Sequence, residues 1–155
     1  MSQANHQLEE VYREEGPRLW RAVLAYSGDR EIADDAVAEA FALALAAGER
    51  IRSPEAWIWR VAFRVATAEV KRRSRVRALV PSVSQIYEMP EPLDDLMAAL
   101  ARLSPNQRLA VLLHDYADRP TDELARILGA SRATVHVHLS QGRRRLRQLL
   151  EDRDA

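Results

Sequence analysis

The chain has 155 residues, of which 47% are hydrophobic, and its 23 basic and 23 acidic side chains give a formal net charge of zero. This length suits one compact domain or two small ones. The chain has no cysteine, which excludes disulfides and thiolate metal sites and favours a reducing, cytoplasmic setting. Its longest purely apolar run, the eight residues from Ala40 to Ala47, is too short to cross a bilayer, so we expect no membrane insertion.

The zero net charge conceals strong segregation of charge along the chain. Residues 1–41 hold nine acids against four arginines, whereas residues 60–77 hold seven bases against Glu69 alone. Residues 78–101 carry four acids and no base, and residues 143–147 are basic again. Two separated basic segments are expected of a protein that contacts a polyanion at two places, although solvated helix faces would give the same pattern.

The N-terminal half reads as three helices, because the composition is rich in alanine and leucine and poor in glycine. Helical spacing predicts a first helix with a kink or break at Gly16-Pro17, and a second helix over about 30–46 that packs partly through Leu45. Ser53 and Pro54 suit the start of the third helix, which runs into the first basic segment.

Two tryptophans lie near the start of this third helix. We expect Trp57 to pack in the core, whereas Trp59 could serve either the core or a binding surface.

Regular spacing stops in the stretch "ALVPSVSQIYEMPEPLDD", which has three prolines and no base. It reads as an acidic linker between two small helical domains. The predicted limits are residues 1–77 for the first domain, 78–92 for the linker and 93–155 for the second domain.

The second domain contains the spacing of a helix-turn-helix. Ala125 provides a small residue where the second helix crosses the first, Gly129 suits a turn with positive φ, and Val135 is a β-branched residue to bury. Such spacing also occurs in helical hairpins, but Ser131 as an N-cap and the arginines that follow favour a DNA-reading helix in the major groove. The predicted DNA-contacting residues are Ser131, Arg132, Ala133, Thr134, His136, Val137, His138, Arg143 and Arg144.

Within this set, Arg132 can donate to guanine, and Ala133 or Val137 can meet a thymine methyl group. His136 and His138 point about 200° apart on one helix, so they cannot chelate the same metal ion. No metal site is therefore predicted. The sequence also shows no nucleophile–histidine–acid set or glycine-rich phosphate loop, so we expect neither an enzyme nor a cofactor.

Together these segments resemble the extracytoplasmic-function (ECF) sigma factors, the small two-domain initiation subunits of bacterial RNA polymerase. The resemblance covers about residues 8–150 and is carried by "DDAVAEAF", "WIWRVAFRVA", "LSPNQRLAVLL" and "ELARILGASRATVHVHLSQGRRRLRQLL". It implies that the chain binds core polymerase, recognises and melts promoters, and can have an anti-sigma factor as a partner.

The resemblance also implies roles for particular residues. Asp35, Glu39 and Phe41 match the acidic helix that docks on the clamp helices of the largest polymerase subunit. The loop from Gly48 to Ser53 and the basic helix after it would hold the melted minus-ten strand, with one base flipped into a pocket. The candidates for that contact are Arg50, Arg52, Arg60, Arg64 and Lys71, and the helix-turn-helix would read the minus-thirty-five element.

The chain departs from the family pattern at Ala38, Arg64 and Ala68, where glutamine, asparagine and aspartate are common. His136 and His138 stand where lysine and arginine are common, so binding to the minus-thirty-five element is expected to be stronger at acid pH. Two alternatives stay open: a LuxR-like DNA-binding regulator, whose reading helix shares "TV-x-x-H", and a sigma-like protein that binds partners without initiating.

Overall fold

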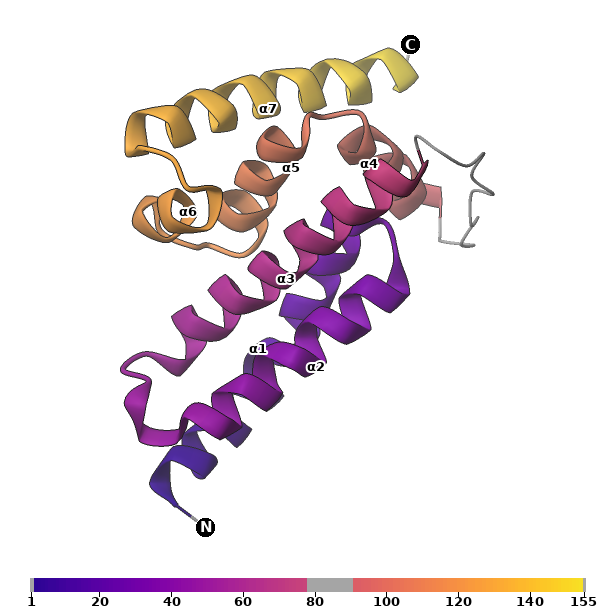
Figure 1. The fold of residues 1–155 in the computed structure, drawn as a ribbon. Helices are drawn as coiled ribbons and strands as arrows, with labels where there is room; N and C mark the ends of the chain where they lie inside the picture. Colours follow the sequence, from indigo (N-terminus) through magenta and orange to yellow (C-terminus); the bar gives the residue numbers. More distant parts are fainter. Residues whose placement is uncertain (1, 78–90, 155) are drawn as a thin grey trace. The chain divides into compact units, whose positions relative to one another are not determined.

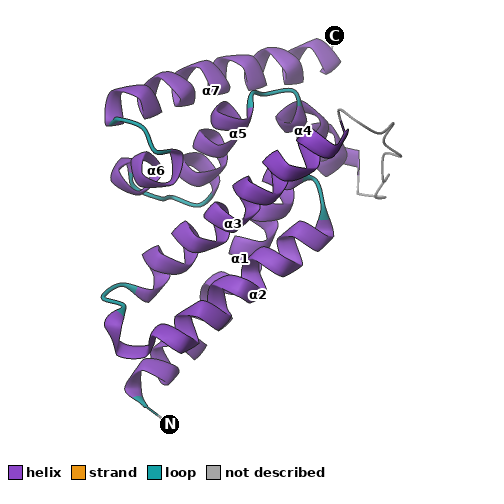
Figure 2. Ribbon diagram, viewed as in Figure 1, coloured by secondary structure: helices purple, strands orange, loops and turns teal. Residues whose placement is uncertain are grey.

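The computed structural model describes residues 2–77 and 91–154 (Figure 1, Figure 2). Within these residues all the regular secondary structure is helical. The predicted all-α class is therefore confirmed. The chain divides into two compact units, Met1–Glu69 and Val70–Ala155. Because this division falls within a continuous helix, the predicted domain limits at residues 77 and 93 remain predictions.

The N-terminal unit is built from three long helices and one short turn. These elements are α1 (Gln3–Ser27), α2 (Arg30–Ala47), the 3-10 turn η1 (Gly48–Arg50) and the first part of α3 (Pro54–Arg77), and Figure 1 shows the three helices side by side. Gly28 ends α1 with φ of 68°, a left-handed conformation that favours glycine. The Asp29 carboxylate then accepts hydrogen bonds from the first amides of α2.

The predicted break at Gly16-Pro17 is absent, because α1 runs unbroken through Pro17. Proline removes one hydrogen bond from a helix interior, but burial of the flanking apolar face supplies most of the stability of a protein helix. Here Leu8, on one side of Pro17, and Leu19 and Val23, on the other, are buried on the same helix. Tertiary packing therefore outweighs the local helix breaker.

Large aromatic side chains fill the core of this unit. Trp59 is fully buried and its ring stacks on Phe63 with centroids 6.1 Å apart, while Tyr26 of α1 meets Phe63 edge-on. The indole Nε1 of Trp59 donates to Glu15 Oε2 over 3.2 Å, which satisfies its only polar atom. Trp59 is thus a core residue that joins α3 to α1.

Two packing predictions need correction. Trp57 is only half-buried, because Ile58 and Trp59 take the inward positions at the start of α3. Leu45 is 57% exposed, because Phe41 and Ala44 hold the inward face of α2 at its C-terminal end.

Within the described residues, the C-terminal unit contains the end of α3 and five further helical elements. They are α4 (Glu91–Ala101), α5 (Pro105–Val111), the π-helical turn η2 (Leu112–Tyr116), α6 (Thr121–Leu128) and α7 (Arg132–Asp154). Ser104 and Gln107 form a reciprocal capping box at the start of α5. Residues 91 and 92, predicted to end the linker, belong to α4, whereas the predicted linker residues 78–90 lie outside the described residues.

A single glycine permits the close crossing of α5 and α7. A Cβ added at Gly142 would lie 2.9 Å from Val111 Cγ2 and 3.1 Å from the Gln107 carbonyl oxygen. Such distances leave no room for a side chain, so the backbones approach closely here. Around the crossing, Leu109, Leu113 and Val135 are fully or almost fully buried.

None of the helices in residues 2–77 and 91–154 is both long and apolar enough to cross a membrane.

Candidate polymerase and nucleic-acid interfaces

Helices α6 and α7 form the predicted helix-turn-helix. Gly129 ends α6 in the left-handed conformation, with φ of 63° and ψ of 39°, and its amide donates to the Ala125 carbonyl. Val135 is fully buried, as predicted, together with Leu124 of α6. Ala125 itself is half-buried, so the deepest contact of α6 is made by its neighbour Leu124.

The start of α7 exposes four of the predicted DNA-reading side chains. Arg132, Ala133, His136 and Val137 are all exposed, and Val137 is 52% exposed although it is apolar. Exposed apolar side chains on a reading helix are suited to contact a thymine methyl group. This face therefore has the residue types that base reading requires, and the contacts themselves remain predictions.

Three other predicted residues are engaged within α7 or partly covered. Ser131 Oγ accepts a hydrogen bond from the Thr134 amide over 3.1 Å and lies 2.9 Å from Thr134 Oγ1, so both hydroxyls belong to the helix cap. His138 is half-buried, and its Nδ1 is enclosed without a hydrogen-bond partner among the described residues. The two histidines thus differ in exposure, and the expected pH dependence of DNA binding stays a prediction.

Arginines of α7 pair with carboxylates from the preceding elements. Arg132 forms an ion pair with Asp122 of α6, with Nε and Oδ1 as the closest atoms. Further along α7, Arg153 Nη2 lies 2.6 Å from Asp95 Oδ1 of α4.

The ion pair of Arg143 has the best geometry. Its Nε donates to Asp115 Oδ2 over 2.9 Å and its Nη2 donates to Asp115 Oδ1 over 2.5 Å, so the ion pair is bidentate. Nη2 also lies 3.1 Å from His114 Nδ1. The hydrogen bond from Arg143 lowers the pKa of the Asp115 carboxyl, while burial opposes that change. Arg143 therefore links α7 to η2 although 44% of its side chain stays exposed, and Arg144 beside it is exposed as well.

Carboxylates gather on the exposed face of α2. Asp35 and Glu39 are both exposed and lie four residues apart, which places them on one side of the helix. Next to them, Asp34 Oδ1 accepts a 2.7 Å hydrogen bond from Trp20 Nε1. Phe41 is only 8% exposed and meets the ring of Tyr12 edge-on at 4.9 Å, so it packs between α1 and α2 instead of offering surface.

The predicted minus-ten residues are placed on η1, the loop after it and α3. Arg52, Arg64 and Lys71 are exposed, and Arg60 is half-buried. Arg50 folds back on α2, where its Nε donates to the Ala47 carbonyl over 3.1 Å and its Nη2 to the Ala46 carbonyl over 3.4 Å. Because these carbonyls end α2, Arg50 serves as its C-terminal cap in this structure.

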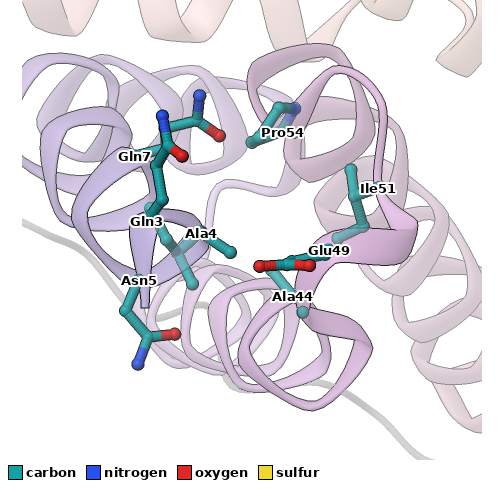
Figure 3. Close-up of a pocket in the computed structure, with 10 residues that line it drawn as sticks. Gln3, Ala4, Asn5, Gln7, Ala44, Glu49, Ile51 and Pro54 are labelled. Atoms are coloured by element: carbon teal, nitrogen blue, oxygen red, sulfur yellow. The ribbon is translucent and has the colours of Figure 1, made fainter. Parts of the chain in front are cut away.

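An open pocket of about 340 Å³ adjoins η1 and the loop after it. Figure 3 shows Gln3 and Gln7 of α1 on one side, and Glu49, Ile51 and Pro54 on the other. Its volume lies at the lower end of the range of small-molecule sites, about 300–1,000 Å³. The complete lining is Gln3, Ala4, Asn5, Gln7, Leu8, Ala44, Gly48, Glu49, Ile51 and Pro54.

Reasoning from the sequence missed both the pocket amides and the carboxylates that hold the α7 arginines. Nothing in the sequence marks Gln3 or Gln7, because they reach the loop only through the packing of α1 beside α2. Asp122 could have been noticed, since it stands in the first turn of α6, but its partner depends on how α7 crosses α6.

Family comparisons agree with both units. The model of sigma-70 region 2 matches residues 11–76, and that of sigma-70 region 4 matches residues 93–146. The ECF RNA polymerase sigma factor SigL of Mycobacterium tuberculosis is 31% identical over 92% of this chain and 88% of that protein. The chain belongs to the ECF sigma factor family.

Other relatives point the same way. The ECF RNA polymerase sigma factor SigE of Mycolicibacterium smegmatis is 29% identical over 92% of this chain, which spans only 61% of that longer protein. A solved structure of the sigma factor RpoE, in complex with the anti-sigma factor NepR from Bartonella quintana, has a TM-score of 0.81. It covers 94% of this chain and 97% of that chain at 22% identity, a level at which the likeness concerns the fold.

Membership of the family excludes the first of the earlier alternatives. A LuxR-like regulator would not carry a sigma-70 region 2, and that region matches most of the N-terminal unit. Sigma factors are transcription initiation factors rather than enzymes, so this ECF sigma factor belongs to a non-enzymatic class.

Proposed function

We propose that this ECF sigma factor acts in the cytoplasm, binds core RNA polymerase and directs it to promoters through two DNA-binding units. The observation that carries the proposal is the presence of both sigma-70 regions in one chain. One offers an exposed acidic helix beside a basic one, and the other a helix-turn-helix with exposed reading residues. Run-off transcription with core polymerase and a promoter library tests it, and a chain that binds core without producing transcripts would be a partner-binding protein only.

The polymerase contact is assigned to the acidic face of α2. Asp35 and Glu39 are exposed on one side of that helix, where they can meet a basic surface of the largest-subunit clamp helices. Reversing both carboxylates to lysine should abolish co-purification with core polymerase.

A matched control is available on α1. Glu10 and Glu14 are also exposed and four residues apart, so E10K/E14K makes the same change in charge on another helix. This control should keep core binding. If both double variants lose core binding equally, the loss is explained by net charge alone, and the assignment of the contact to α2 is wrong.

The minus-ten contact is assigned to α3 and to the loop beside the pocket. Arg52, Arg64 and Lys71 are exposed and would follow the backbone of a single strand, as basic grooves do. The pocket offers amide groups and the carboxylate of Glu49 to one unpaired base. A carboxylate accepts from an exocyclic amino group, so cytosine or adenine fits this pocket better than thymine.

Substitution of the pocket carboxylate tests that preference. E49Q should narrow the difference between cytosine and thymine at one position of a single-stranded minus-ten probe, because its amide can also donate. An unchanged base preference would contradict the role of Glu49 in base selection. It would not bear on the proposed contacts of α3 with the strand backbone.

The minus-thirty-five contact is assigned to the exposed start of α7. Arg132 would donate to guanine, while Val137 and Ala133 would meet thymine methyl groups. Arg144 would reach a phosphate. Arg143 would approach a phosphate with Asp115 already bound to its Nε and Nη2, so the charge that it adds to a DNA contact is partly neutralised.

A protein inhibitor is a candidate partner of this sigma factor. The RpoE structure of similar fold was solved with an anti-sigma factor. A second structure of similar fold holds CnrH with the cytosolic domain of CnrY, with a TM-score of 0.71 at 19% identity. A cognate inhibitor should compete with core polymerase for the chain.

A further inference from the structure

The ion pair between Arg132 and Asp122 joins the first turn of α6 to the first turn of the reading helix α7. Arg132 is the residue proposed to read guanine, and its side chain is 68% exposed. Asp122 is 60% exposed, so both groups remain accessible to a DNA duplex. The pair therefore lies on the surface that DNA would cover.

The atoms that meet decide what the pair can do. The closest approach is between Arg132 Nε and Asp122 Oδ1, at the inner edge of the guanidinium. A guanidinium can read guanine end-on by donating from its two terminal nitrogens. A contact made at Nε does not use these two nitrogens. A carboxylate at Nε thus restricts the rotation of the side chain without occupying the donors that a base would use.

We propose that Asp122 is a positioning residue that sets base preference at the minus-thirty-five element by holding the Arg132 guanidinium. The inference rests on the proposed DNA-reading role of α7. An arginine on a solvated helix end loses rotamer freedom when it binds, and a side chain already held by a neighbouring carboxylate loses less. Asp122 also brings a negative charge near the phosphates, which weakens binding to every duplex alike, so only its hold on Arg132 depends on the base.

Two opposite effects are therefore expected from D122N. Removing the charge should raise affinity for unrelated duplex DNA, since one repulsion with the phosphates disappears. Loss of the hold on Arg132 should reduce discrimination at the base pair that Arg132 reads. Since a good bidentate arginine–guanine contact separates right from wrong bases by about tenfold or more, we expect D122N to lose about threefold to tenfold of that ratio.

The experiment uses the full chain assembled with core polymerase. Wild-type holoenzyme first selects its preferred sequence from duplexes randomised over the minus-thirty-five element, and equilibrium competition at fixed salt then gives each base ratio. R132A identifies the position that Arg132 reads. D122N is measured at that position, and D122N/R132A completes a double-mutant cycle in which D122N should change the ratio no further.

A matched control removes the same charge and frees another arginine of α7. D95N releases Arg153, which lies about 30 Å along the helix from Arg132. It should leave the base ratios unchanged.

The outcomes separate the proposal from its premise. If R132A changes no base ratio, α7 does not read DNA through Arg132 and the proposed function of that residue fails. If R132A changes a ratio but D122N raises affinity for all sequences equally, Asp122 is only a repelling charge and the positioning role is overturned. The positioning role is also overturned if D122N still changes the base ratio in the R132A background.

Discussion

The two long helices rich in basic residues, α3 and α7, are anchored in different ways. Helix α3 is anchored by large aromatic side chains, with Trp59 and Phe63 fully buried. Helix α7 is anchored by the smaller buried side chains of Val135, Leu139 and Leu149 and by a close crossing at Gly142, with exposed ion pairs to acids of α4, η2 and α6 beside them. Basic residues counted along the sequence therefore overstate the positive charge that α7 presents, because part of it is already neutralised by neighbours.

The largest expected effect concerns the aromatic anchor of α3. W59A removes a fully buried indole and leaves Glu15 without its donor, so the free energy of unfolding should fall by about 3–5 kcal/mol. W59F keeps an aromatic ring against Phe63 and should lose distinctly less. Urea unfolding of the full chain measures the free energy of unfolding of both variants. Equal losses in W59A and W59F would mean that ring packing against Phe63 does not stabilise α3.

The glycine anchor of α7 gives the next largest effect. G142A places a methyl group 2.9 Å from Val111 Cγ2, and we expect a loss of about 1–3 kcal/mol in the free energy of unfolding. Gly16 in α1 is the comparison, because beyond its chain neighbours a Cβ there would meet only the Tyr12 ring, at 3.9 Å, although Pro17 disfavours the helical conformation for a preceding residue that has a Cβ. G16A should therefore lose less free energy of unfolding than G142A, and a stabilising G142A would show that the crossing can open at no cost.

The pairing of Arg143 with Asp115 predicts that Arg143 responds to salt differently from exposed bases of α3. R64A or K71A on α3 should each lower the slope of promoter affinity against salt by about one, as expected for loss of a phosphate contact. R143A should change the slope less, because Arg143 is already bound by Asp115. Holoenzyme binding to a promoter fork over a range of salt concentrations measures this, and an equal effect of R143A would mean that DNA displaces Asp115.

The smallest expected effect is the pH dependence of the Arg143–Asp115 pair. Its hydrogen bond lowers the pKa of Asp115 from the ordinary value of 3.8, so the stabilisation is present above that value. It is lost as pH falls through the lower pKa of the folded state. Because both side chains are more than a third exposed, the contribution is about 1 kcal/mol or less.

Substitution by the uncharged amide isolates this contribution. D115N should be less stable than the wild-type chain at neutral pH, and the difference should vanish in acid. D94N, which changes an exposed carboxyl on α4, should show no such convergence. A D115N deficit that is constant with pH would assign the effect to packing rather than to charge.

Much of the fold follows from local signals, which explains where reasoning from the sequence succeeds. Ser104, Gly129 and Ser131 mark helix ends through side-chain and backbone capping, and these interactions involve only near neighbours in the chain. Burial of Val135 follows from the spacing of the helix-turn-helix. Such features are set within a few residues and need no knowledge of the partner helix.

What the sequence did not predict depends on contacts between elements. The continuity of α1 through Pro17 and the burial of Trp59 in preference to Trp57 are decided by how helices pack. The same holds for Arg50, which is drawn back to the end of α2, and for Arg143, which is taken by Asp115. In the candidate sites, residue types were predictable from sequence, but the partners of their charged groups were not.

The close crossing at Gly142 is also the point about which a tilt of α7 against α5 would turn the helix. Arg132 lies ten residues away, about 15 Å along a stiff helix. A tilt of about 5° at the pivot would move the reading end by about 1 Å, a displacement comparable to the tolerance of a base contact. A substitution at this distant glycine could thus alter which promoters are chosen without touching DNA, even in a chain that still folds.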